Sequence, residues 1–131
     1  MKSVVICGSR RYRPEIVEFA EKLQELGVVV FAPYLHEGKD EWDKLSEQYK
    51  KFTALGLTHD HFHKIEMADV VFVYNKDGYS GNSTTLEIGY SVATKKPIYA
   101  FSDKDKDEEL CRNVLFRGIF TTPEELLKVL K

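Results

Sequence analysis

With 131 residues, the chain is long enough to bury one core without disulfide bonds or a structural metal. Its hydrophobic fraction of 43% and charged fraction of 31% exclude a disordered chain, and 19 basic against 21 acidic residues, a net charge of -2, argue against a nucleic acid polymer as partner. No apolar run is long enough for a bilayer span or a signal peptide core, and Cys7 and Cys111 do not have the spacing of a metal-binding or disulfide-bonded pair. We therefore expect one cytoplasmic domain over residues 1–131 that contacts no membrane.

Four short apolar runs rich in β-branched residues predict buried strands at 3–7, 28–32, 70–74 and 97–101. Amphipathic stretches separate these runs, as expected for parallel strands joined by crossover helices. The sequence therefore predicts the α/β class: a three-layer α/β/α domain with a mostly parallel sheet, flavodoxin-like or Rossmann-like.

The first helix is expected to begin near Pro14, to bury a stripe that includes Phe19 and Leu23, and to end at Gly27. The segment 36–57 is rich in charged residues, and we expect a mostly exposed helix flanked by loops, a candidate lid. Further helices are expected over 58–68 and 123–130, and a charged surface loop over 103–109.

The loop after the first strand is a candidate ligand site, because ligands of open parallel sheets bind beyond the carboxyl ends of the strands. Cys7 leads into Gly8, which lets the backbone approach a ligand, and Ser9 and Arg11 offer donors that suit a phosphate. The loop matches neither the Walker pattern nor GxGxxG, so we expect no nucleotide cofactor. A tight turn with solvated arginines is the alternative.

The loop after the third strand, residues 75–89, gathers glycine and hydroxyl residues before a helix. Gly81 and Ser83 lie where the free N–H groups of the helix suit an anionic or sugar ligand. Glu87 is expected in the first helical turn, facing the cleft. The same spacing also forms a capping box, in which Glu87 returns to the N–H of Thr84. Spacing alone leaves both interpretations open.

Four segments together resemble the nucleoside 2-deoxyribosyltransferase family, which includes 2'-deoxynucleoside 5'-monophosphate N-hydrolases: residues 7–9, 68–71, 83–89 and 96–98. They span nearly the whole chain in the family's order. The resemblance implies cleavage or transfer at the N-glycosidic bond of (2'-deoxy)nucleosides or their 5'-monophosphates through a covalent glycosyl-glutamate. It gives Glu87 the role of the nucleophile that attacks the anomeric carbon and expels the base.

The resemblance also implies binding residues. Ser9 and Arg11 fall where the monophosphate hydrolases hold a 5'-phosphate, and Ser83 falls on a polar loop with a similar use, so a nucleotide is favoured over a free nucleoside. Asn113 falls in the stretch from which a neighbouring subunit completes the family's active site. A homodimer or larger homo-oligomer is therefore implied.

Two positions depart from the family. His61 stands at the spacing of the family's aspartate that assists proton transfer to the departing base, with Asp60 one residue earlier, and either side chain can supply the proton. Val5 replaces a first-strand tyrosine found in some members. Either the sugar pocket differs from that of these members, or another tyrosine supplies part of it, the candidates being Tyr12, Tyr34 and Tyr79.

A histidine-based metal site is not expected. Of the three histidines in this region, only His59 and His63 share a helical face, and the sequence places no Glu or Cys beside them at ligand spacing. A solvated helix edge explains both.

Two other functions stay open. A non-catalytic nucleotide sensor would use the same cleft, with Glu87 only capping its helix. A phosphoribohydrolase of the cytokinin-activating type shares part of the 83–87 turn, but the chain lacks its Pro-Gly-Gly run.

Overall fold

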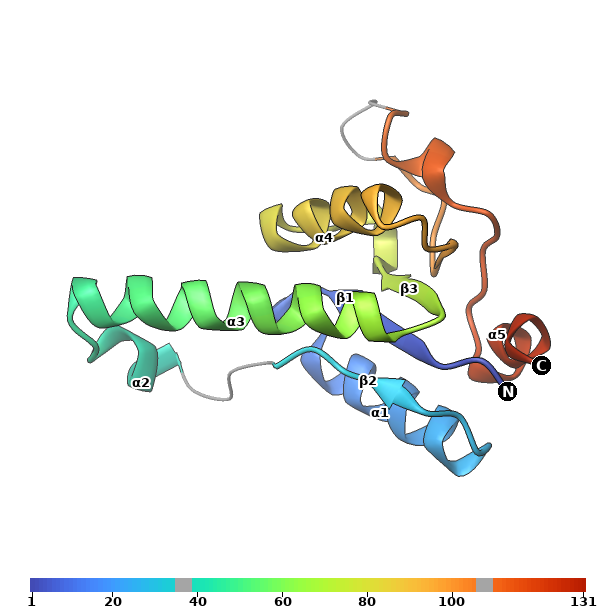
Figure 1. Cartoon of the computed structure of the whole chain (residues 1–131), viewed down its shortest axis with the longest axis horizontal. Coiled ribbons are helices and arrows are strands. Elements are labelled where there is room, and N and C mark those ends of the chain that lie inside the picture. The colour runs from blue at the N-terminus through green and yellow to red at the C-terminus, as the bar shows by residue number, and fades with distance from the viewer. Residues whose placement is uncertain (35–38, 106–109) are drawn as a thin grey trace.

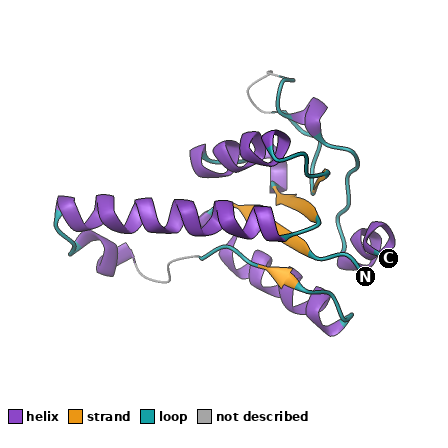
Figure 2. Cartoon of the chain, viewed as in Figure 1, coloured by secondary structure: helices purple, strands orange, loops and turns teal. Residues whose placement is uncertain are grey.

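The computed structural model describes residues 1–34, 39–105 and 110–131. Its centre is a sheet of four parallel strands, β1 (Val4–Gly8), β2 (Val30–Phe31), β3 (Val70–Tyr74) and β4 (Ile98–Ala100), in the order β2-β1-β3-β4 (Figure 2). The predicted parallel sheet is confirmed. β2 and β4 are shorter than predicted because they lie at the edges, where each pairs with only one of these strands.

The strands alternate between two cores, as the two-residue period of a strand requires. Ile6 and Phe72 face the core formed with α1 (Arg13–Glu25) and α5 (Pro123–Leu130). Val5 and Val71 face the opposite core, formed with α3 (Glu47–Met67) and α4 (Asn82–Ala93). Helices therefore cover both faces, and the predicted three-layer α/β/α arrangement is confirmed.

The first and last helices follow the predicted capping signals. α1 has a proline in its first turn, buries Phe19 and Leu23, and is followed by Gly27 at a φ of 88°, the left-handed conformation that glycine adopts without strain. The predicted helix over 123–130 is confirmed as α5. Its cap is Thr122, whose hydroxyl accepts a hydrogen bond from the Glu125 N–H at 3.2 Å.

The middle of the chain differs from the prediction. A short helix α2 (Lys39–Asp43) precedes α3, a single 21-residue helix, so the separate helix predicted over 58–68 is wrong at its start. Ser46 caps α3 by accepting from the Tyr49 N–H at 3.2 Å, and no proline interrupts the helix. The predicted start at 36 lies outside the described residues. Figure 1 shows the first half of α3 projecting beyond the sheet, with α2 beside it.

Asn75, directly after β3, fixes the loops at the carboxyl end of the sheet. It is fully buried, and its Oδ1 accepts from the N–H groups of Phe101 at 3.1 Å and Ser102 at 2.9 Å. Its Nδ2 donates to the Ser102 carbonyl at 2.9 Å. One side chain thus joins the loops that follow β3 and β4, and holds the edge that leads into α4.

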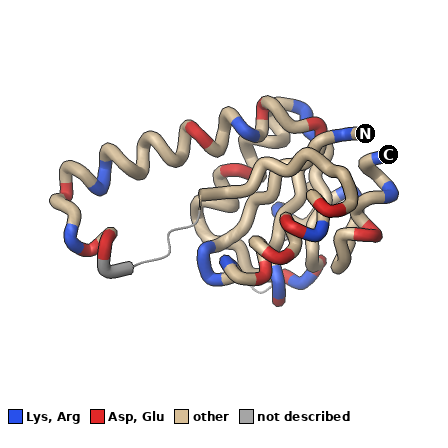
Figure 3. The backbone as a smooth tube through the Cα atoms, turned by 90° about the horizontal axis from the view of Figure 1, so that it is seen from below, with Lys and Arg blue, Asp and Glu red and all other residues tan. Residues whose placement is uncertain are grey.

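Acidic and basic positions are interspersed along the described chain in the view of Figure 3. This matches the near-balanced charge of the chain. Among the helices described, none combines the length and the apolar character needed to cross a bilayer. Both cysteines are free thiols, Cys7 buried and Cys111 exposed.

Candidate active site

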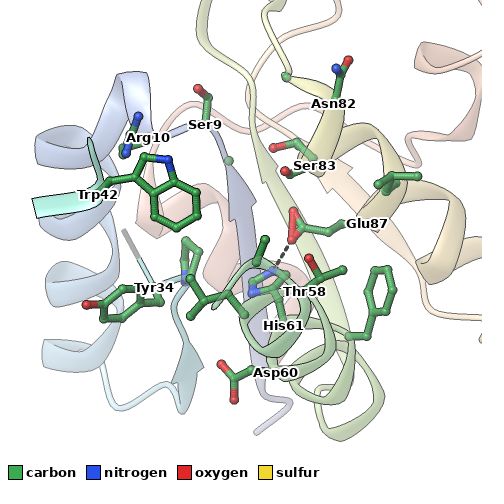
Figure 4. A pocket seen from close by; sticks show the side chains of 18 residues that line it. Ser9, Arg10, Tyr34, Trp42, Thr58, Asp60, His61, Asn82, Ser83 and Glu87 are labelled. Carbon is green, nitrogen blue, oxygen red and sulfur yellow. Dashed lines mark ion pairs between the residues drawn. The ribbon is translucent and has the colours of Figure 1, made fainter. Parts of the chain in front are cut away.

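A cavity of about 390 Å³ opens at the carboxyl ends of β1 and β2, beside the N-terminus of α4 (Figure 4). β2 lies on one side of β1 and β3 on the other, so this is the point where the strand order reverses and where open α/β sheets bind ligands. Its lining residues are Gly8, Ser9, Arg10, Pro33, Tyr34, Trp42, Ala54, Leu57, Thr58, Asp60, His61, Phe62, Gly81, Asn82, Ser83, Thr84, Leu86 and Glu87.

Glu87 lines the cavity with only 13% of its side chain exposed, and its Oε2 lies 3.3 Å from His61 Nε2. α4 begins at Asn82 with Gly81 as its cap, so Glu87 stands in the second turn, and the predicted first-turn position is wrong. The capping box with Thr84 is wrong for the same reason, since Thr84 lies inside the helix. The carboxyl group is therefore directed at His61 and the cavity (Figure 4).

Burial controls the protonation of this pair. It raises the pKa of Glu87 to about 8, and it lowers the pKa of His61 to about 4, with Lys64 lowering and Asp60 raising the His61 value. At pH 7 the neutral forms of both groups are favoured. The contact between them is then a hydrogen bond from a carboxylic acid to an imidazole, and the pair holds one proton.

Cys7, the last inward-facing residue of β1, lies beneath the same pair. It is fully buried, and its Sγ lies 3.3 Å from His61 Nε2. Burial raises the pKa of the Cys7 thiol well above its usual value, and the charge of Glu87 adds to this. Cys7 is therefore a protonated thiol that supports the histidine rather than a surface ligand of the loop.

Of the two acid/base candidates, His61 contacts Glu87 and Asp60 does not. Asp60 also lines the cavity, but its side chain is 53% exposed and pairs with Lys64 at 3.0 Å. In Figure 4 it lies on the far side of His61 from Glu87. Within the described residues, His61 is thus the nearer proton donor to anything held by Glu87.

Four of the predicted binding residues line the cavity: Gly8, Ser9, Gly81 and Ser83. A side chain at Gly8 would be crowded, because a Cβ there would lie 2.6 Å from Ile16 Cδ1 and 3.2 Å from the Tyr74 carbonyl oxygen.

Arg11 is not among the lining residues. Its guanidinium lies over the Tyr79 ring, 3.6 Å from the ring centroid, and its backbone N–H donates to Ser9 Oγ at 3.1 Å. Arg10 lines the cavity instead. The two arginines belong to a 3-10 turn, η1 (Arg10–Tyr12), in which neighbouring side chains point about 120° apart.

Aromatic side chains form part of the wall, and two of them are not assigned by the sequence analysis. Trp42 comes from α2 and Phe62 from α3, and Tyr34 is the one of the three candidate tyrosines that lines the cavity. Tyr12 is buried and donates its hydroxyl proton to the Lys76 carbonyl at 2.7 Å, while Tyr79 faces Arg11. The position of Trp42 agrees with the expectation that a segment before residue 57 borders the site.

Asn113 lies outside the cavity, in the short turn η3 (Asn113–Leu115). Its Nδ2 donates to the carbonyls of Asp103 at 2.8 Å and Lys104 at 3.1 Å. A role in a neighbouring subunit's site stays a prediction.

His59 and His63 are exposed, and His63 Nδ1 lies 3.7 Å from Glu66 Oε2, as expected of a solvated helix edge.

Residues 6–115 match the family model of nucleoside 2-deoxyribosyltransferase. The matched range includes the end of β1, all of β2, β3 and β4, and helix α4. The chain therefore belongs to the nucleoside 2-deoxyribosyltransferase family. Among curated proteins, none matches it in sequence.

Solved structures share the fold. A 2-deoxyribosyltransferase of Bacillus psychrosaccharolyticus is 18% identical with a TM-score of 0.70, and the match covers 95% of this chain and 89% of that one. A CMP N-glycosidase of Clostridium botulinum is 19% identical with a TM-score of 0.55, covering 98% and 97%. A 2-desoxiribosyltransferase of Leishmania mexicana is 17% identical with a TM-score of 0.54, covering 79% and 66%. The family and these neighbours indicate an enzyme that transfers or hydrolyses an N-glycosidic bond.

Proposed function

We propose that this protein cleaves the N-glycosidic bond of a 2'-deoxynucleoside 5'-monophosphate, or of the nucleoside itself, through a glycosyl ester on Glu87. One observation carries the proposal: a buried carboxyl group on α4 faces a cavity at the switch point of the sheet and touches a histidine at 3.3 Å. A cavity of about 390 Å³ falls in the size range of small-molecule sites. A catalytic pair in such a cavity fits the chemistry of retaining glycosidases.

The proton shared by the pair supplies the acid. In the first step His61 accepts the Glu87 proton, the carboxylate attacks the anomeric carbon, and the C–N bond breaks as His61 donates its proton to the departing base. In the second step water attacks the anomeric carbon, gives one proton to His61, and breaks the bond from that carbon to the Glu87 oxygen, so that the carboxylate leaves. The proton then moves from His61 to Glu87, which restores the starting state of the pair. An acceptor base in place of water gives transfer instead of hydrolysis.

The cavity also offers donors for a phosphate. Ser9 and Arg10 lie on its η1 side, and Asn82 and Ser83 line it at the N-terminus of α4, where no side chain caps the helix. Free N–H groups at a helix N-terminus suit an anion. This grouping favours a monophosphate over a free nucleoside. Arg11 joins it only if its guanidinium leaves the Tyr79 ring.

The wall formed by Tyr34, Trp42 and Phe62 suits the planar base. Because Trp42 belongs to the short helix α2, movement of that helix would open and close this side of the site. We assign α2 and the start of α3 to the lid that the sequence analysis expects.

We also propose a homodimer. The projecting half of α3 carries exposed Tyr49, Phe52 and Leu55, and Leu86 at the cavity mouth is 62% exposed, so apolar surface surrounds the open side of the site. A second copy placed there would cover this surface and bring its Asn113 region near the substrate. Sedimentation of the full chain, with Phe52→Glu as the variant, tests this, and a monomer at all concentrations contradicts it.

We place this single-domain enzyme in the cytoplasm, where nucleotides are available and where free thiols such as Cys7 and Cys111 persist. Localisation of a fluorescent fusion to the membrane or to an extracytoplasmic compartment contradicts this assignment.

A nucleotide sensor is the second candidate. The observation in its favour is the pKa of about 8 for Glu87, which leaves the would-be nucleophile protonated at neutral pH. In that case the chain binds a nucleotide and releases no base.

The deciding experiment incubates the protein with each deoxynucleoside and its 5'-monophosphate and separates the released bases by chromatography. Wild type should release base, Glu87→Gln should release none, and Glu21→Gln, which changes an exposed carboxylate on α1, should match wild type. Release into water alone identifies a hydrolase, and exchange with an added base identifies a transferase. Full activity of Glu87→Gln contradicts the proposed nucleophile, and tight binding without release supports the sensor.

A further inference from the structure

Three potential metal ligands meet at the base of the cavity. Cys7 comes from β1, His61 from α3 and Glu87 from α4. The thiol sulfur and the carboxyl oxygen each lie 3.3 Å from His61 Nε2, and the three atoms all lie within 4.8 Å of one another. Sequence spacing does not reveal this group, because its members are far apart along the chain.

Two of the three spacings between these atoms fit tetrahedral zinc. Zinc binds sulfur at about 2.3 Å and imidazole nitrogen or carboxylate oxygen at about 2.0 to 2.2 Å, so neighbouring ligands of a tetrahedral ion lie about 3.3 to 3.6 Å apart. The two contacts to His61 Nε2 are already close to that value. We propose that Cys7, His61 and Glu87 bind one Zn²⁺ ion, with its fourth position open to the cavity.

Charge balance supports a divalent ion at this depth. Binding releases the Cys7 thiol proton and the Glu87 carboxyl proton, so that two anionic ligands and a neutral imidazole surround the ion and the buried cluster has no net charge. A softer or borderline ion is selected by the sulfur, which disfavours Mg²⁺ and Ca²⁺.

The site lacks one feature of a structural zinc centre. A ligating histidine usually donates its second ring N–H to a fixed acceptor, whereas His61 Nδ1 is buried without a hydrogen-bond partner in the part of the chain that the structure describes. We therefore expect reversible binding, weaker than in a structural zinc site. Bound zinc would occupy the Glu87 carboxylate and His61 Nε2 and so inhibit base release, a consequence that rests on the proposed function.

The test uses the full chain after removal of metal with a chelator. Co²⁺ is titrated as the spectroscopic probe, and Zn²⁺ is then added in competition. Wild type should bind one ion per chain, with a sulfur-to-cobalt charge-transfer band in the near ultraviolet and the intense visible bands of tetrahedral cobalt. Cys7→Ser should lose the near-ultraviolet band, and Cys111→Ser, which changes the exposed free thiol, should keep it.

Glu87→Gln provides a second variant that conserves the shape of the side chain. It should keep the near-ultraviolet band while its Zn²⁺ affinity falls by at least about 10- to 100-fold, the loss caused by changing a residue that only supports a ligand. Circular dichroism confirms that each variant is folded. No band in wild type, or a band that depends on Cys111 instead of Cys7, overturns the metal site.

Inhibition is measured separately, as base release with and without one equivalent of Zn²⁺. Loss of activity that a chelator restores is the expected result. If zinc binds through Cys7 and Glu87 while base release continues at the wild-type rate, the metal site stands and the catalytic role of Glu87 is overturned.

Discussion

Replacing Glu87 by glutamine should stabilise the protein, although it removes the proposed nucleophile. The folded-state pKa of Glu87 is raised by burial from 4.5 to about 8, so the folded protein binds a proton that the unfolded chain releases. The stability linked to this group is fully present below pH 4.5 and is lost as the pH rises through 8. Glutamine conserves the shape and cannot ionise.

The size of the effect follows from the two pKa values. Relative to wild type, Glu87→Gln should gain about 1 kcal/mol in unfolding free energy at pH 5, about 3 kcal/mol at pH 7 and about 5 kcal/mol above pH 9. His61, whose pKa is lowered by burial, contributes to both proteins, so its share largely cancels in the difference.

Urea unfolding followed by circular dichroism at pH 5, 7 and 9 measures this, with a chelator present. For a slope of about 1.5 kcal/mol/M, the difference at pH 7 is a midpoint shift of about 2 M. Glu21→Gln is the control and should show only a small shift at each pH. A Glu87→Gln midpoint that equals or lies below that of wild type at pH 9 would refute the claim that a buried carboxyl faces the cavity.

Three further predictions concern activity and stability. The pair of Glu87 and His61 must hold one proton for catalysis, so kcat/KM measured in the presence of a chelator should be flat between pH 5 and 7 and fall above about pH 8. A kcat/KM that rises through pH 8 would show that the Glu87 carboxylate acts without a proton from the histidine. Arg10→Ala should raise KM for a monophosphate about fivefold, as fits an exposed ion pair worth about 1 kcal/mol, and leave KM for the nucleoside unchanged. Arg11→Ala should have a smaller effect, and the reverse ranking contradicts the assignment. Asn75→Ala should lower the unfolding free energy by about 2 kcal/mol in urea titrations, because it leaves the part-buried N–H and carbonyl of Ser102 without this partner, while the Phe101 N–H keeps the Val73 carbonyl; a loss below about 1 kcal/mol contradicts that account.

The sequence is most informative where burial and capping act locally. The run Val70–Tyr74 is apolar throughout because helices cover both faces of this central strand, and its bounds are predicted correctly. Pro123 and Gly27 mark helix ends by conformations that few other residues favour. These signals do not depend on the rest of the chain.

The sequence is less informative where several residues satisfy the same rule. Hydroxyl residues crowd the start of α4, so a cap at Thr84 and a cap at Gly81 are equally compatible with the pattern, and a shift of three residues moves Glu87 from capping its helix to facing His61. The predicted separate helix start at residue 58 is wrong because one helix runs from Glu47 through this position and packs on α4.

The spacing of residues along the sequence does not predict contacts between distant segments. The meeting of Cys7 with His61 depends on how α3 lies across β1, and no periodicity records it. Whether Arg10 or Arg11 faces the cavity depends on how the 3-10 turn η1 is oriented, because neighbouring side chains of such a turn point in different directions. The family resemblance names Glu87, His61 and, among three tyrosines, Tyr34, which all line the cavity, but it does not name Trp42 or Phe62.

Mass spectrometry of a trapped intermediate tests the role of Glu87 most directly. A 2'-fluoroarabino nucleoside monophosphate slows both steps by destabilising the oxocarbenium-like transition state, and the second step has no activated leaving group to compensate. After incubation and digestion, the peptide that contains Glu87 should carry the mass of the fluorinated sugar phosphate, with the ester on Glu87. Base release without any adduct, or an adduct on another residue, contradicts the proposed mechanism.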